Sequence, residues 1–167
     1  MLSNFQNKSQ KTEQREEKQF IVFTIGDERF GVDVNQAREI IPSTDLTRVP
    51  NSPDFVTGVI NLREEIIPII DLQKKLALNM SSARDIDEKI IIIELDNSLI
   101  GMEVDNVSEM LRLSISDIAA PPKIVKGINR NYLSGVGKLE DKLLILLDLS
   151  KILSAEEIEE LDKMEIN

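Results

Sequence analysis

An internal repeat constrains the fold of this chain more than any other feature of its sequence. Three blocks align in the same order: residues 23–41 on 93–111, residues 55–61 on 124–130, and residues 66–76 on 143–153. Their shared positions include Gly31 on Gly101, Pro53 on Pro122 and Asp71 on Asp148. Chance similarity between apolar strands does not keep three blocks with matched Gly, Pro and Asp in one order. The chain therefore carries two copies of one structural unit.

Each copy has the pattern of a small β unit. Residues 19–34 read as a β-rich run, a Gly-Asp turn and a second alternating run, which is a hairpin pattern, and residues 89–107 repeat it. Each copy predicts four or five short strands, and the second has a longer turn between its last strands, 130–142 against 62–65. One such unit is too small to bury a core alone, so the two copies should pack together as a pair of small antiparallel barrels. Barrels of this size are filled by their own side chains, which leaves no active-site cavity.

Polar segments divide the rest of the chain. Residues 79–88 are polar and predict a linker, and Ser154 with Glu157 three residues later fits a capping box at a helix start. The predicted parts are a flexible tail over 1–18, repeat halves over about 20–78 and 89–153, and a C-terminal helix over 154–165.

The composition argues against catalysis. The chain has no His and no Cys, which removes the commonest general base near neutral pH, thiolate chemistry and disulfides. Residues 135–138 read GVGK, but Tyr132 and Leu139 stand where a phosphate-binding loop needs Gly and Ser or Thr, so a hairpin turn is the better interpretation. No calcium-loop pattern is present. We predict a protein that is not an enzyme and that uses no cofactor or metal.

Charge and hydropathy exclude further classes. The formal net charge is −10, and the lysines and arginines are scattered, so we expect no nucleic-acid partner. The longest apolar runs are far shorter than a membrane span, and the first ten residues have no apolar secretion signal. The chain is predicted to be cytoplasmic, and a binding or scaffolding role remains.

Two linked motifs resemble a known family. Residues 58–63 read GVINLR, residues 68–72 read PIIDL, and the chain ends on GVGKLEDKLLILLDLSKIL. Together these resemble the CheW family of chemotaxis adaptors over about residues 19–165. The resemblance implies two packed five-stranded SH3-like barrels with short helices. It also implies an adaptor that couples the cytoplasmic tips of chemoreceptors to the histidine autokinase CheA in membrane-associated arrays. Such a protein would be a monomer in isolation.

The resemblance also implies a receptor-binding surface. In the family, the arginine of the N-L-R turn lies near an acidic residue, and here these positions are Arg63 and Glu39. We expect both residues to be exposed at element ends, where they can pair and orient a partner. Ala37, its repeat equivalent Val107, and nearby Met110 are expected to line a groove between the barrels that takes the receptor's helical hairpin. The alternative is that these three apolar residues are simply core.

Two opposite barrel ends are implied as kinase contacts. One comprises Thr57, Glu65 and Ile66, and the other comprises Lys123 and Ile124. Exposed apolar anchors such as Ile66 dominate small interfaces, and two contacts per adaptor permit a linked lattice. The chain departs from the family at Glu64, where many relatives have Gly, and at Glu65, where many have an apolar residue. The change at Glu64 could alter the shape of the turn. The glutamates also suggest that charge contributes to the first kinase contact.

Two other functions fit the same sequence. The first is the same adaptor fold in a paralogous pathway that controls an output other than motility. The second is a small-molecule-binding β-barrel, which would require a pocket with convergent polar groups.

Overall fold

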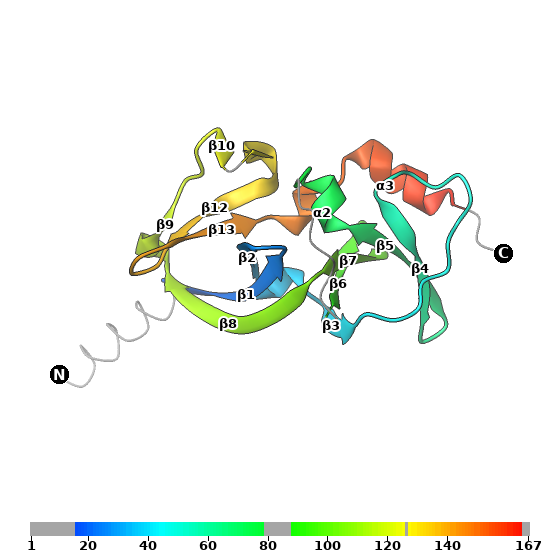
Figure 1. Cartoon of the computed structure of the whole chain (residues 1–167), viewed down its shortest axis with the longest axis horizontal. Coiled ribbons are helices and arrows are strands. Elements are labelled where there is room, and N and C mark those ends of the chain that lie inside the picture. Colours follow the sequence, from blue (N-terminus) through cyan, green and yellow to red (C-terminus); the bar gives the residue numbers. More distant parts are fainter. Residues whose placement is uncertain (1–15, 79–87, 126, 165–167) are drawn as a thin grey trace, which may run out of the picture.

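The computed structural model describes residues 16–78, 88–125 and 127–164, and this part of the chain forms two large β-sheets, one two-stranded sheet and several short helices (Figure 1). In barrel A the strand order is β8 (Asn106–Ser114), β1 (Glu17–Ile25), β2 (Glu28–Asp33), β13 (Leu143–Leu147), β12 (Leu133–Lys138) and β9 (Ile118–Ala119). In barrel B it is β3 (Glu39–Pro42), β6 (Lys89–Leu95), β7 (Ser98–Val104), β5 (Glu65–Asp71) and β4 (Val56–Leu62). The mainly β, two-barrel fold is confirmed.

Short elements connect the strands. A separate hairpin joins β10 (Ile124–Val125) to β11 (Ile128–Asn129). The short helices are η1 (Val34–Gln36), α2 (Leu72–Lys75), η2 (Ile115–Asp117), η3 (Arg130–Tyr132), η4 (Leu149–Lys151) and α3 (Ala155–Asp162). The tail expected over 1–18 lies outside the described residues except for its last three, and β1 already begins at Glu17. The expected linker over 79–88 lies outside them except for Glu88.

The two repeat copies exchange their hairpins. The β1–β2 hairpin of the first copy lies between strands of the second copy in barrel A, and the β6–β7 hairpin of the second copy lies between strands of the first in barrel B. Each barrel joins its inserted hairpin through one parallel pairing, β13 with β2 and β5 with β7. The expectation of purely antiparallel barrels was therefore wrong, because strand exchange brings the hairpin in beside a strand of the other copy that runs in the same direction.

Strand register corrects the alignment of the middle block. The same bulge interrupts β4 between Val56 and Gly58 and β12 between Leu133 and Gly135. The backbone also closes alike, since Asp71 N donates to Phe55 O at 2.8 Å and Asp148 N donates to Tyr132 O at 2.9 Å. Residues 55–61 therefore correspond to 132–138 and not to 124–130.

A close backbone approach explains why glycine marks this bulge. A Cβ on Gly58 would lie 2.7 Å from Thr47 O, and one on Gly135 would lie 3.0 Å from Ala119 O. The corrected alignment makes the hairpin turns equal in length, 62–65 and 139–142, so the predicted longer turn was wrong. The extra residues of the second copy lie before η3, where they form the β10–β11 hairpin.

Both faces of the exchanged hairpins are buried. On β1, Phe20 and Val22 belong to a cluster inside barrel A, whereas Ile21 and Phe23 belong to the largest cluster, which draws on both barrels. Phe23 stacks on Phe30 within it, with 5.9 Å between ring centroids. Burial on both faces explains why β1 and β6 read as nearly unbroken apolar runs instead of alternating.

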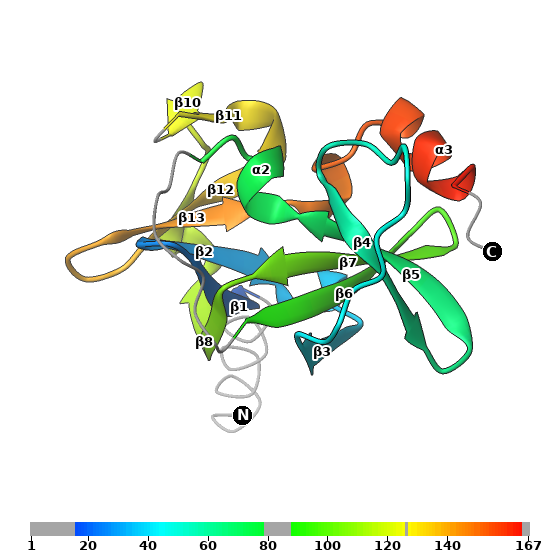
Figure 2. The same cartoon turned by 45° about the vertical axis from the view of Figure 1, so that its right-hand side comes forward.

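The C-terminal helix α3 connects the two barrels. It follows η4 of barrel A, yet it lies beside the β6–β7 turn of barrel B (Figure 2), where Ser98 donates to Asp162, and its Glu157 reaches Lys75 of α2. Lys75 Nζ lies 2.6 Å from Glu157 Oε2 and 4.9 Å from the Phe55 ring centroid. The predicted capping box of Ser154 and Glu157 is confirmed.

We expect the contribution of Glu157 to stability to fade at low pH. Burial alone raises the pKa of this carboxyl, but hydrogen bonds from Lys75 and Ser154 outweigh burial and hold the pKa below the usual 4.5. A lowered pKa adds stability above the unfolded-state value, and this stability is lost as pH falls through the folded-state pKa. Wild type should exceed Glu157→Gln by about 1 kcal/mol in free energy of unfolding at about pH 7, and by much less at about pH 3. Urea titrations at both pH values measure this, and a constant difference would contradict the assignment.

Candidate protein-interaction site

The turn of the β4–β5 hairpin has an unusual backbone. Leu62 pairs with Glu65, and the two residues between them, Arg63 and Glu64, have φ of 50° and 70°. Both lie in the left-handed region, which suits the twist of a two-residue hairpin but costs energy for residues other than Gly, Asn and Asp. The turn therefore adopts a left-handed backbone with Glu64, and not glycine, at its second central position.

Glu64→Gly is expected to stabilise the protein by about 1 kcal/mol, because glycine adopts positive φ without a steric cost. The matched control is Glu140→Gly in the equivalent β12–β13 turn, where Glu140 does not have positive φ. That control should be neutral or destabilising. Thermal unfolding of both variants measures the contrast, and stabilisation by both or by neither would refute the strain argument.

An ion pair joins this turn to the opposite edge of barrel B. Arg63 Nη2 donates to Glu39 Oε2 on β3 as predicted, but Glu39 is half-buried and not exposed as expected. This hydrogen bond and the charge of Glu39 raise the pKa of the Arg63 guanidinium. β3 and β4 are the two terminal strands of the sheet, so the pair spans the gap that the Thr47–Val59 bridge also crosses. The Arg63 side chain is 71% exposed, which leaves part of the guanidinium open to a partner.

The other barrel has no equivalent of this pair. The repeat places Glu109 in the position of Glu39 and Glu140 in the position of Arg63. Glu109 instead pairs with Arg29 of the inserted hairpin, at 2.8 Å. Barrel B therefore differs from barrel A in having an arginine at a hairpin turn that pairs with a glutamate on the edge strand β3.

The remaining predicted receptor contacts differ in exposure. Ala37 and Val107 are half-buried against the core shared by the barrels. Met110 is 56% exposed on β8, and its repeat equivalent Ile40 is also exposed. Shallow pockets of about 280–640 Å³ occur elsewhere on the described surface, and the residues that line these pockets do not include Ala37, Val107 or Met110. A receptor groove at these residues stays a prediction.

The predicted kinase contacts fall at two separate places. Glu65 and Ile66 are exposed on the β4–β5 hairpin, with Ile66 47% exposed, and half-buried Thr57 donates weakly to Glu103 at 3.5 Å. Lys123 is exposed just before β10. The backbone of Ile124 belongs to β10, but its side chain lies outside the described residues. Figure 1 places β10 over barrel A, away from the β4–β5 hairpin of barrel B.

The sequence analysis missed the most exposed of the described large apolar residues. Leu143 is 70% exposed and starts β13 at the repeat position of Ile66. The alignment of 66–76 on 143–153 already paired these residues. The repeat alignment could therefore have identified Leu143. The tips of the β4–β5 and β12–β13 hairpins carry equivalent aliphatic side chains.

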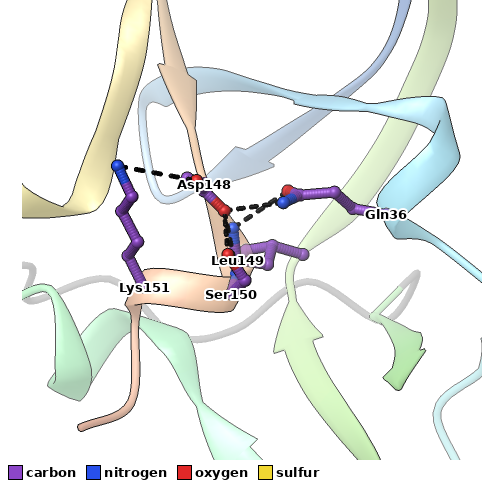
Figure 3. Close-up of polar contacts among 5 residues, drawn as sticks. All are labelled: Gln36, Asp148, Leu149, Ser150 and Lys151. Atoms are coloured by element: carbon purple, nitrogen blue, oxygen red, sulfur yellow. Dashed lines mark hydrogen bonds and ion pairs between the residues drawn. The ribbon is translucent and has the colours of Figure 1, made fainter. Parts of the chain in front are cut away.

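A second contact missed from the sequence joins the two repeat copies (Figure 3). Gln36 Nε2 donates to Asp148 Oδ1 at 2.6 Å, and Leu149 N donates to Gln36 Oε1 at 3.0 Å. Burial tends to raise the pKa of Asp148, but hydrogen bonds from Ser150 and Gln36 lower it overall. Asp148 also caps η4 as Asp71 caps α2, which explains why both copies keep this aspartate.

Within the described ranges, we find no group of three residues that could hold a metal and no helix long and apolar enough to cross a membrane. Two small barrels filled by their own side chains, with charged and aliphatic residues at exposed hairpins, define the class of paired SH3-like barrel proteins.

The chain belongs to the CheW family, because residues 19–157 match the CheW-like domain. It is 37% identical to the chemotaxis protein CheW of Klebsiella aerogenes over 146 residues, which is 87% of each chain. It is 33% identical to the CheW of Treponema pallidum, covering 87% of this chain and 88% of that one. The crystal structure of the scaffolding protein TtCheW from Thermoanaerobacter tengcongensis has a TM-score of 0.77 and 31% identity, covering 84% of this chain and 90% of that chain. The fold and family implied by the sequence are thus confirmed.

Proposed function

We propose that this protein is a non-enzymatic adaptor that couples chemoreceptors to the autokinase CheA. Arg63, Glu39, Ala37, Val107 and Met110 would contact the receptor tip. The kinase regulatory domain would bind at two places, with Thr57, Glu65 and Ile66 in the first contact and Lys123 and Ile124 in the second. The protein would act in the cytoplasm at membrane receptor arrays.

The observation that carries this proposal is the exposed face of the β4–β5 hairpin in a member of the CheW family. Ile66 is a large aliphatic side chain left open to solvent, and it lies in the same hairpin as the Arg63–Glu39 pair. An exposed aliphatic residue beside a fixed charge supplies an anchor and an orienting group for a protein partner. The barrel interiors also support a binding role, since fully buried side chains such as Phe23, Phe30 and Ile69 fill them.

Calorimetric titration of the full chain with the regulatory domain of its cognate CheA tests the kinase half of the proposal. Saturable binding is expected. Absence of binding to the kinase, together with absence of binding to a receptor hairpin tip, would overturn the proposed function. Binding to another signalling kinase alone would assign the adaptor to a paralogous pathway.

Arg63→Asp is expected to weaken receptor-tip binding about tenfold, because it removes an exposed cation and adds repulsion beside Glu39. The exchange variant Arg63→Glu with Glu39→Arg is the matched control, since it restores an ion pair across the same gap. If Arg63 contacts the receptor, the exchange variant should regain thermal stability but not receptor affinity. Recovery of both would show that the pair acts only on the fold.

A further inference from the structure

A shallow pocket at the end of barrel A collects positive charge. It measures about 640 Å³, and Arg130, Lys151 and Ser150 line it together with the apolar Pro121, Leu133 and Leu153. The described residues that line it include no acidic side chain. This is notable in a chain with 30 acidic and 20 basic residues.

The extra segment of the second copy leads directly into this pocket. The β10–β11 hairpin returns the chain so that Arg130 N donates to Lys123 O at 3.1 Å. Arg130 then begins η3, whose Asn129 cap sets the direction of the chain. Lys123 and Arg130 are both exposed, and they are brought together by this backbone pairing. Arg130 and Lys151 therefore line the pocket, and Lys123 lies next to Arg130 through this backbone contact.

Lys151 keeps much of its charge available. Its Nζ lies 3.9 Å from Asp148 Oδ2, which is the limit of an ion pair, and its side chain is 60% exposed. The other oxygen of Asp148 accepts from Gln36 and Ser150 (Figure 3). A carboxylate shared among so many donors neutralises Lys151 only in part.

The equivalent pocket of barrel B has a different charge. Val56 and Lys74 occupy there the repeat positions of Leu133 and Lys151. Asp54 and Asp71 also line that pocket, which measures about 500 Å³, and they balance Arg48 and Lys74. The surplus of positive charge is therefore a property of the barrel A pocket and not of the repeated fold.

We propose that the cationic pocket of barrel A docks an acidic segment of the partner kinase, with Asp or Glu side chains beside an aliphatic one. The cations would meet the carboxylates, while Pro121, Leu133 and Leu153 would accept the aliphatic group. The pocket adjoins Lys123, so it extends the second proposed kinase contact, and the inference rests on the proposed function. Charge complementarity of this kind speeds association and weakens with salt.

The test titrates the cognate CheA regulatory domain into the full chain at about 50 mM and about 300 mM NaCl. Arg130→Glu with Lys151→Glu should weaken binding about tenfold at low salt and flatten its salt dependence. Lys18→Glu with Arg112→Glu is the matched control, because these two exposed cations line another pocket of barrel A that contains no proposed kinase contact, and it should stay within about twofold of wild type. Arg130→Glu alone, which leaves Asp148 and η4 intact, provides the test if the double variant fails to fold.

The outcomes separate the two proposals. No binding by wild type would contradict the kinase half of the proposed function and this inference with it. Binding by wild type that the barrel A variants leave unchanged, or that the control weakens equally, would overturn the inference alone. Another possible occupant of the pocket is a second copy of this chain. Analytical ultracentrifugation of the chain alone measures this self-association. If the barrel A variants abolish self-association but not kinase binding, the pocket docks a second copy and the inference is wrong.

Discussion

Neither repeat copy is expected to fold alone. Fragments 1–82 and 83–167, prepared separately, should lack cooperative unfolding, and mixing them should restore a native-like one-to-one complex. The reason is the hairpin exchange, because the β1–β2 hairpin finds its neighbours β8 and β13 only in the second copy. The Gln36–Asp148 contact also joins the two fragments.

Far-UV circular dichroism and size-exclusion chromatography of each fragment, and of their mixture, measure this effect. A separated fragment would expose the face of β1 that Ile21 and Phe23 bury against the other barrel. The intact chain, refolded under the same conditions, is the control. Cooperative unfolding of either fragment alone would show that a copy can close its own barrel and would contradict the exchange argument.

Ile66→Asp is expected to weaken kinase binding about a hundredfold, while the free energy of unfolding changes little. In the complex, the substitution would remove the apolar contact area of Ile66 and place an unpaired charge in the interface. The Ile66 side chain is already about half exposed in the free protein, so the folded state loses little packing. Calorimetric titration with the CheA regulatory domain and a urea unfolding curve measure the two effects.

Leu143→Asp is the matched control for this substitution. Leu143 has the same repeat position on the β12–β13 hairpin and is also exposed, but it belongs to neither proposed kinase contact. It should leave kinase affinity within about twofold of wild type. Equal losses from both substitutions would show that the two hairpin tips bind alike. No loss from Ile66→Asp would remove this hairpin from the first contact.

Local chemistry made much of the fold and part of the site predictable. The capping box of α3 and the hairpins at Gly26 and Asp96 depend on residues close in sequence, and all were expected. Arg63 and Glu39 were expected to pair because the family resemblance placed them together. The alignment of the middle block failed because apolar-x-x-Gly occurs twice in the second copy, and only the β-bulge register identifies the correct glycine.

The sequence by itself determined that the chain has two related β units. It also determined where most strands and turns lie, and which charged residues the β4–β5 hairpin carries. Only the tertiary structure decided which copy supplies each hairpin to each barrel. Both copies have the same apolar strands, so pairing within a copy or between copies satisfies the same local pattern, and the packing of the shared core selects the exchange. The cationic pocket likewise depends on tertiary structure, because Arg130 and Lys151 lie on elements separated by two whole strands and meet only when η3 and η4 pack together.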